Sequence, residues 1–172
     1  MFNRTIINDL KHWREQKDRK PLMMLGARQV GKTSVLKRFG RECFEHCVYF
    51  SLDEEAGVCD IFRTTKNPTQ IIEQLSYLTD EPILPEKTLL ILDEIQDCPE
   101  AISSMKYFCE KTPEYAIACA GSLLGLAFGH EGFSFPVGKV DHINMYPVTF
   151  SEFLEQKDSG LYRYYKSIDS ID

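Results

Sequence analysis

The residues with the clearest chemical pattern run from Gly26 to Thr33, where the sequence reads Gly-Ala-Arg-Gln-Val-Gly-Lys-Thr. This order matches Gly-x4-Gly-Lys-Thr, the pattern of a loop that binds phosphate groups. The two glycines let the backbone curve until its N–H groups point inward at phosphate oxygens, and the N-terminus of a following helix adds positive potential. We therefore expect Lys32 to act in catalysis by contacting the β- and γ-phosphates of a nucleotide, and the Thr33 hydroxyl to bind Mg²⁺.

The whole loop and the residue after it are expected to contact the nucleotide. These residues are Gly26, Ala27, Arg28, Gln29, Val30, Gly31, Lys32, Thr33 and Ser34. The alternative is a glycine-rich turn with an exposed lysine. The flanking sequence favours the phosphate loop, because residues 22–25 are an apolar run typical of a buried strand and residues 32–40 have the apolar spacing of a helix.

An acidic pair, Asp93 and Glu94, follows a second apolar run at residues 88–92. A phosphate loop requires an acidic residue at a strand end that positions Mg²⁺, and we expect Asp93 to hold the metal directly or through water. Glu94 would polarise the attacking water as a general base, which favours hydrolysis over transfer to a second substrate. The alternative is that Glu94 only solvates the strand end.

The elements that must position these residues alternate between strands and helices. We expect strands at residues 22–25, 48–52, 88–92, 115–120 and 140–145, and helices at 4–17, 32–40, 68–79, 99–111 and from residue 149 onward. The strand segments are uniformly apolar, as in a parallel sheet that is buried on both faces. The sequence therefore predicts an α/β fold, a parallel sheet with helices on both faces.

These motifs resemble the additional-strand P-loop ATPases, the AAA-like group. They resemble more closely a prokaryotic family of predicted ATPases whose members join such a domain to a C-terminal domain of unknown function. The resemblance rests on residues 25–33, 92–96, 120–124 and 146–154, which together span most of the chain.

The resemblance implies ATP rather than GTP as the nucleotide, and a five-stranded sheet of the additional-strand AAA/RecA-like type. In that sheet the strand ending at Ser122 would lie between the strand of Asp93 and the strand before the phosphate loop. Ser122 would then sit beside the γ-phosphate as a polar sensor with a part in catalysis. The structural alternative is that Ser122 is a helix cap or a turn residue, since serine favours both.

The chain also departs from the family. It has Lys139 where relatives often have arginine, and only Arg163 follows Arg63 among its arginines. An arginine finger contributes about 10³–10⁵ in turnover, so we expect weak ATP hydrolysis by this chain in isolation. Arg28 is a candidate substitute, or a solvent-facing loop residue.

A second function therefore stays open, an ATP-binding switch that does not hydrolyse ATP and acts on a partner or nucleic acid. A small-molecule kinase would need an arginine-bearing lid, which residues 125–138 do not offer.

The end of the chain carries a capping-box pattern, Thr149 followed three residues later by Glu152. The helix that it opens has an aromatic and apolar face, formed by Phe150, Phe153 and Leu154 and then, after a polar Lys-Asp-Ser-Gly interruption, by Leu161, Tyr162 and Tyr165. Such a face needs a partner surface that buries it. We expect an ATPase domain at residues 1–150 and a helical segment at 151–172 that begins a missing C-terminal domain, with a protein partner or a second copy of the chain as further possibilities.

Charge is distributed unevenly over the 172 residues. Residues 1–41 contain 11 Lys and Arg against 3 Asp and Glu, whereas the remainder contains 9 against 23, for a net charge of −6. A nucleic-acid role rests only on this basic end, where Lys17, Arg19 and Lys20 could form a patch. The simpler interpretation is a solvated helix beside a phosphate-binding site.

Six cysteines, at positions 43, 47, 59, 98, 109 and 119, include no Cys-x-x-Cys pair. Cys43, His46 and Cys47 lie close in sequence, but no fourth ligand with suitable spacing supports a zinc site. Reduced and mostly buried thiols are the expected state. The N-terminus lacks a secretion signal and no apolar run is long enough to cross a membrane, so we expect a cytoplasmic protein.

Overall fold

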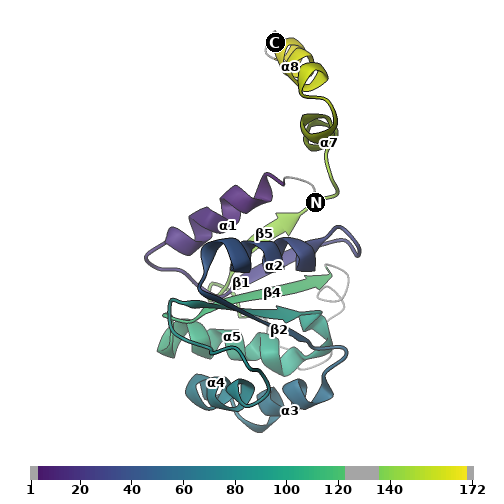
Figure 1. Cartoon of the computed structure of the whole chain (residues 1–172). Helices are drawn as coiled ribbons and strands as arrows, with labels where there is room; N and C mark the ends of the chain where they lie inside the picture. The colour runs from purple at the N-terminus through teal and green to yellow at the C-terminus, as the bar shows by residue number, and fades with distance from the viewer. Residues whose placement is uncertain (1–3, 123–135, 170–172) are drawn as a thin grey trace.

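The computed structural model describes residues 4–122 and 136–169 and contains a five-stranded, fully parallel sheet (Figure 1). The strands are β1 (Leu22–Gly26), β2 (His46–Ser51), β3 (Thr88–Asp93), β4 (Ala116–Ser122) and β5 (Asp141–Met145). Their order is β2-β3-β4-β1-β5, with β4 between β3 and β1. The expected parallel α/β sheet and its inserted strand are thus confirmed.

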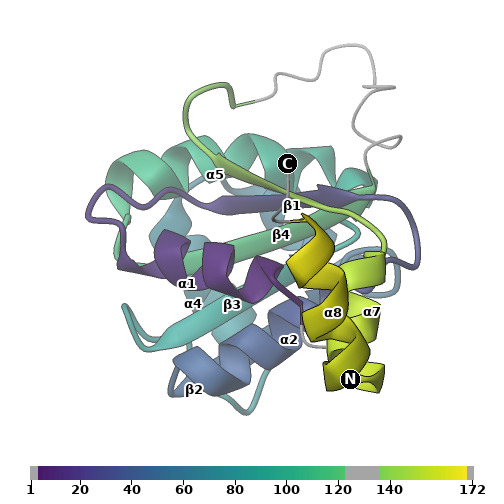
Figure 2. The same cartoon turned by 90° about the horizontal axis from the view of Figure 1, so that it is seen from above.

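Helices cover both faces of this sheet, as Figures 1 and 2 show. One face carries α1 (Ile6–Glu15) and α2 (Lys32–Cys43), and the other carries α3 (Ala56–Thr64), α4 (Pro68–Ser76) and α5 (Pro99–Lys111). Successive strand residues point to opposite faces. Leu89 and Ile91 therefore pack beneath α1 and α2, whereas Leu90 and Leu92 pack against α3, α4 and α5.

Two elements differ from the sequence prediction. Helix α3 was not predicted from the sequence, although Val58, Ile61 and Phe62 are spaced as on one helix face and are all buried. The helix expected after Thr149 is two helices, α7 (Phe150–Lys157) and α8 (Ser159–Asp169). The chain is extended at Asp158, whose carboxylate accepts from the N–H groups of Gly160 and Leu161 in the first turn of α8. The break between the two helices lies within the polar Lys-Asp-Ser-Gly interruption noted in the sequence.

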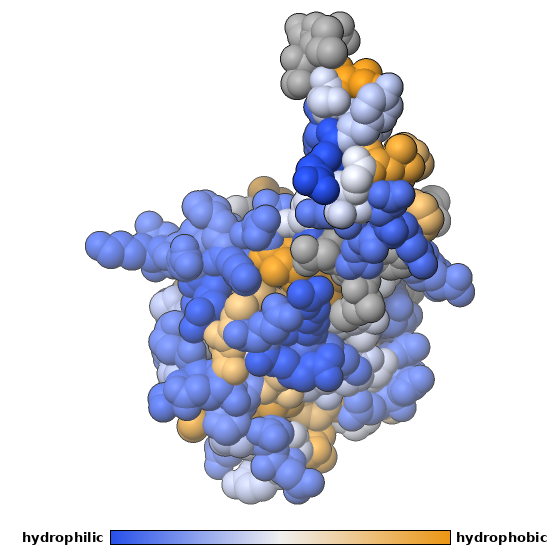
Figure 3. Space-filling model, turned by 45° about the horizontal axis from the view of Figure 1, so that its top comes forward, coloured by the Kyte–Doolittle hydropathy of each residue, from blue (hydrophilic) through white to orange (hydrophobic). Residues whose placement is uncertain are grey.

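The helices α7 and α8 project from the body of the domain (Figure 1). The predicted capping box is present, with Thr149 and Glu152 as reciprocal partners. Apolar side chains gather on these two helices in Figure 3, and Phe150, Leu161 and Tyr164 are exposed. Of the aromatic and apolar face predicted from the sequence, Phe150, Phe153 and Leu161 are thus exposed among the described residues, whereas Leu154 is buried.

A buried ion pair joins this projection to the first residues of the domain. Arg4 and Glu152 are both less than a tenth exposed, and the Arg4 Nε lies 3.3 Å from the Glu152 Oε1. The Glu152 carboxylate also accepts from the backbone N–H of Thr5 at 3.0 Å and from that of Thr149 at 2.9 Å. Burial alone would raise the pKa of this carboxyl, but these hydrogen bonds and the Arg4 charge outweigh burial and lower the pKa.

All six cysteines are free thiols. Within residues 4–122 and 136–169, no group of three or more His, Cys, Asp or Glu side chains could hold a metal ion. Among the helices of those same residues, none combines the length and the apolar character that crossing a bilayer requires.

The first prediction concerns Glu152→Gln, which keeps the shape of the side chain but removes its charge. We expect the free energy of unfolding, measured in urea, to fall by about 1–3 kcal/mol, because Arg4 and the backbone N–H and hydroxyl groups of Thr5 and Thr149 lose a charged acceptor. The pKa in the folded protein lies below the ordinary value of 4.5. The carboxylate therefore stabilises the fold above that pH, and this contribution is lost as the pH falls through the lowered pKa.

The matched control is Glu155→Gln, an exposed position on the same helix. It should leave the unfolding free energy unchanged and should not alter its pH dependence. Equal stability of the two variants at neutral pH would contradict the stabilising role of the Arg4–Glu152 pair.

Candidate active site

The phosphate-loop residues connect β1 to α2 at the carboxyl edge of the sheet. Gly26 ends β1, and Gly31 precedes α2 with a left-handed backbone at φ 94°. Among the described residues, no acceptor is bonded to the backbone N–H groups of residues 28–31, and the first turn of α2 contains no acidic residue. The loop therefore offers free donors and the positive end of a helix dipole to an anion.

Gly26 is required by the close approach of β5. A Cβ at this position would lie 2.3 Å from the Met145 carbonyl oxygen, which belongs to the adjacent strand. Backbone on that side cannot move away without breaking the pairing of β1 with β5. A side chain is therefore excluded where the loop leaves the sheet.

Lys32 lies across the loop rather than in solvent. Its side chain is buried, and its Nζ donates to the carbonyl oxygens of Gly26 at 3.0 Å and Ala27 at 2.8 Å. The ammonium group is thus held over the curved backbone by two weakly basic acceptors. Phosphate oxygens placed on the loop would be within the reach of this charge, and they are stronger partners than carbonyl groups.

The two predicted metal ligands are in contact. The Thr33 hydroxyl donates to the Asp93 Oδ2 at 2.5 Å, and Tyr49 on β2 donates to the same oxygen at 3.2 Å. Burial raises the pKa of the Tyr49 hydroxyl, and the Asp93 carboxylate adds to the rise. The Lys37 ammonium group lies over the Tyr49 ring, 3.2 Å from the ring centroid. Hydroxyl and carboxylate oxygens are the donors that Mg²⁺ prefers, so the pair fits that ion.

Glu94 follows Asp93 at the end of β3 with a left-handed backbone, φ 49° and ψ 45°. Its carboxylate accepts from the Gln96 side-chain amide at 2.6 Å. Ser122 ends β4 and pairs in register with Gly26, so the predicted sensor lies at the same edge as the loop. Ser122 is in a strand, not at a helix cap.

The remaining loop residues differ in exposure. Ala27, Arg28, Gln29 and Ser34 are exposed, and Val30 is half-buried. Arg28 makes no ion pair with the described residues.

The loop at residues 125–138 lies outside the described residues, except for positions 136–138. Lys139 lies near the amino end of β5, where its Nζ is 2.9 Å from Glu110.

A hollow of about 230 Å³ adjoins the loop on its outer side. Arg4, Val30, Gly31, Ser34, Val35, Met145 and Val148 line it. Its lining is mainly apolar, with one guanidinium that also donates to the carbonyl oxygens of Val30 and Tyr146. Arg4, Tyr49 and Gln96 had no predicted role, because each reaches the site through a contact with a residue far away in the sequence.

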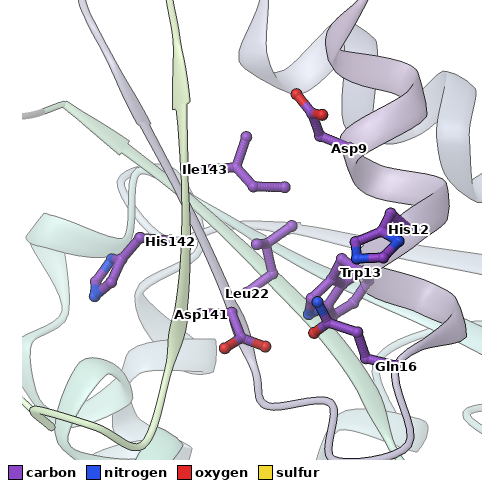
Figure 4. Close-up of a pocket in the computed structure, with 8 residues that line it drawn as sticks. All are labelled: Asp9, His12, Trp13, Gln16, Leu22, Asp141, His142 and Ile143. Atoms are coloured by element: carbon purple, nitrogen blue, oxygen red, sulfur yellow. The ribbon is translucent and has the colours of Figure 1, made fainter.

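A second hollow, of about 290 Å³, lies between α1 and β5 (Figure 4). Leu22 and Asp141, which line it, begin β1 and β5, so it lies at the amino edge of the sheet. His12 from α1 and Gln16, directly after that helix, line this hollow, whereas His142 points to the other side of β5 in Figure 4. This hollow is separate from the phosphate loop.

A family model described as an AAA domain matches residues 18–154. The fold is similar to that in the structure of Drosophila ORC bound to DNA, with a TM-score of 0.56, 12% identity and coverage of 95% of this chain and 48% of that one. It is also similar to the Pif1 helicase from Bacteroides in complex with ADP-AlF3 and ssDNA, with a TM-score of 0.50, 15% identity and coverage of 87% and 43%. A third similar structure is that of C. elegans PCH-2, with a TM-score of 0.50, 12% identity and coverage of 95% of this chain and 49% of that one.

At these identities the likeness to the solved structures is one of fold. The chain spans about half the length of the proteins in those structures. A comparison with curated proteins found no match.

The second prediction concerns Gly26→Ala. The added Cβ would overlap the Met145 carbonyl, so we expect the unfolding free energy to fall by about 1–3 kcal/mol, as for other overpacked sites. Binding of a fluorescent ATP analogue should be lost as the loop is displaced.

Gly57→Ala is the matched control, because nothing lies within 4 Å of a Cβ at that position in α3. It should leave binding intact and raise stability by up to about 1 kcal/mol. A Gly26→Ala protein that binds and unfolds like the wild type would refute the steric assignment.

Proposed function

The chain belongs to the AAA domain family, and we propose that it binds ATP together with Mg²⁺ and hydrolyses the nucleotide at the carboxyl edge of its sheet. The observation that carries this proposal is the contact of Thr33 with Asp93. Two residues 60 positions apart place a hydroxyl and a carboxylate oxygen 2.5 Å from each other, directly beside a loop of free backbone donors. Magnesium bound to Thr33 and Asp93 would neutralise charge on the phosphate oxygens.

Each residue of the site then has a defined task. The loop amides and Lys32 bind the phosphates, with the Lys32 ammonium moving from the carbonyls of Gly26 and Ala27 to phosphate oxygens. Glu94 accepts a proton from the attacking water. Ser122, at the end of β4, donates to the γ-phosphate as a polar sensor.

We place the base and ribose of ATP in the hollow beside Val30 and Val35. This hollow touches the loop on the side away from Asp93, so a nucleotide could lie with its phosphates on the loop and its base outside it. The apolar lining suits a purine ring, and the Arg4 guanidinium is held there by Val30, Tyr146 and Glu152.

We propose that turnover of this chain alone is weak. Of its later cations, Arg63 is engaged with Asp60 and Glu100, and Lys139 with Glu110. An arginine that stabilises the transition state would then come from a partner or a second copy of the chain. These engaged cations also favour a second candidate, an ATP-binding switch without hydrolysis.

We further propose that residues 1–150 form the ATPase domain and that residues 151–172 begin a further helical domain. The exposed apolar face of α7 and α8 supports this division. A nucleic-acid role has less support, because Arg19 of the basic end is buried against Trp13 and paired with Glu86.

The third prediction is that Lys32→Ala weakens ATP binding by more than about tenfold in a fluorescence titration. The reason is the loss of charge-assisted hydrogen bonds, which are worth about 1.5–3 kcal/mol. Lys66→Ala, at an exposed position between α3 and α4, is the charge-matched control and should bind normally. Unchanged binding by Lys32→Ala would mean that the phosphate site lies elsewhere.

The fourth prediction concerns Glu94→Gln. We expect phosphate release from ATP to slow by about 10²–10⁴, with ATP affinity nearly unchanged, because only the general base is removed. Glu73→Gln on the exposed face of α4 should behave as the wild type. Hydrolysis at the wild-type rate by Glu94→Gln would exclude Glu94 as the base. Tight ATP binding by a wild type whose turnover equals that of buffer would instead favour the switch.

A further inference from the structure

The geometry around β3 and β4 points to Gln96 as a positioning residue that fixes the Glu94 carboxylate relative to the end of β4. This inference rests on the proposed function, since it gives Gln96 a part in the same hydrolysis. It concerns a residue that binds neither nucleotide nor metal in the assignments above.

The Gln96 amide bridges a hydrogen-bond acceptor, the Glu94 carboxylate, and a hydrogen-bond donor, the Ser122 backbone N–H. Its Nε2 donates to the Glu94 Oε2 at 2.6 Å, and its Oε1 accepts from the Ser122 backbone N–H at 3.2 Å. A carboxylate only accepts and a backbone N–H only donates, so the bridge needs a donor and an acceptor on one rigid group. A primary amide has both, whereas neither a carboxylate nor an ammonium group does.

The side-chain orientation of Gln96 is fully specified. The Nε2 also lies 3.0 Å from the Asp97 Oδ2, so both N–H bonds and the carbonyl oxygen of the amide have partners. A flipped amide would place oxygen against two carboxylates. The neighbouring Ile95 is fully buried and fixes the short helix η1 (Ile95–Asp97) that carries Gln96.

The end of β4 is shaped to admit this side chain. A Cβ at Gly121 would lie 3.1 Å from the Gln96 Oε1 and 3.0 Å from the Ile95 Cγ2. A residue with a side chain at position 121 would therefore crowd both groups. The absence of that side chain lets the amide reach the Ser122 N–H.

The backbone of Glu94 is held by contacts separate from the one that its side chain makes with Gln96. Its left-handed conformation is uncommon for a residue with a side chain, and residues of this kind persist where surrounding contacts hold them. The Glu94 N–H is held by the Asp93 Oδ1 at 3.1 Å, and its carbonyl accepts from the Asp97 N–H at 2.9 Å. Within residues 4–122 and 136–169, Gln96 donates the hydrogen bond that restrains the Glu94 carboxylate.

The bridge also links the base to the predicted sensor. Ser122 is beside Gly26 in the sheet, so its backbone lies next to the start of the phosphate loop. A displacement of this strand end would be transmitted through one amide to the Glu94 carboxylate. Loss of Gln96 should therefore reduce the rate of hydrolysis and leave nucleotide affinity in place.

The test compares two substitutions of Gln96 in the full chain. Gln96→Met has similar length but no donor or acceptor, and Gln96→Glu keeps an acceptor for Ser122 but replaces the donor to Glu94 with a negative charge. We expect kcat to fall by about tenfold to a hundredfold in both, because a small misplacement of a reacting group has an effect of that size. The KM for ATP and the affinity for a fluorescent ATP analogue should stay within about threefold of the wild-type values.

Gln70→Glu is the matched control. Gln70 is exposed on α4, and its Oε1 accepts from the Thr65 hydroxyl, a bond that a carboxylate retains. It should leave kcat unchanged. A thermal melt of each variant shows whether the folded fraction accounts for any loss.

A double-mutant cycle separates positioning from a general structural role. In a Glu94→Gln protein, Gln96→Met should lower the residual single-turnover rate by less than about twofold, since its target is already disabled. A full, multiplicative loss in that background would overturn the inference. Wild-type kcat in Gln96→Met would overturn it as well, as would a loss of ATP affinity as large as the loss of kcat.

Failure of the proposed function would have a different signature. A wild type without single-turnover hydrolysis above buffer would refute the ATPase and, with it, the role of Gln96. A wild type that hydrolyses ATP, with Gln96 variants that do so equally well, would refute only the role of Gln96.

Discussion

The constraint on which the candidate site depends is that all five strands run in one direction, so that their carboxyl ends share one edge. Gly26, Asp93 and Ser122 each end a strand at that edge. Because β4 separates β1 from β3, the two outer strand ends are about 10 Å apart. The loop and the first turn of α2 span this distance, because the Thr33 hydroxyl lies 2.5 Å from the Asp93 carboxylate. Ser122, at the end of the inserted strand, thereby lies between the strand ends that carry Gly26 and Asp93.

The sequence predicted the elements better than it predicted their contacts. Uniform apolar runs such as residues 88–92 indicated buried parallel strands, but only the family resemblance implied the order of the strands, because register is not a local property. Glu152 matched a capping box and does form one. Its second partner, Arg4, is 148 positions away and left no pattern to recognise. Gln96 lay within a resembling stretch, yet its role depends on Ser122 and Gly121 from another strand.

The basic end of the chain is largely occupied by the fold itself. Arg4 pairs with Glu152 and Arg19 with Glu86, while Lys32 bonds to the loop. The guanidinium of Arg14 lies 5.0 Å from the Phe44 ring centroid, and Lys37 covers Tyr49. The charge asymmetry seen in the sequence therefore reflects ion pairs and cation–π contacts within the domain as well as basic residues on the protein surface.

The position of β1 within the sheet has a consequence for how the chain reaches its native state. β1 is synthesised first among the strands, yet its two neighbours, β4 and β5, come from the second half of the sequence. The hydrogen bonds from Arg4 and Thr5 span 142 and 147 residues. Contacts of such separation form slowly, because a long loop must close before they contribute. During synthesis, the phosphate loop would thus leave the ribosome well before β4 and β5, the two strands that flank β1 in the sheet.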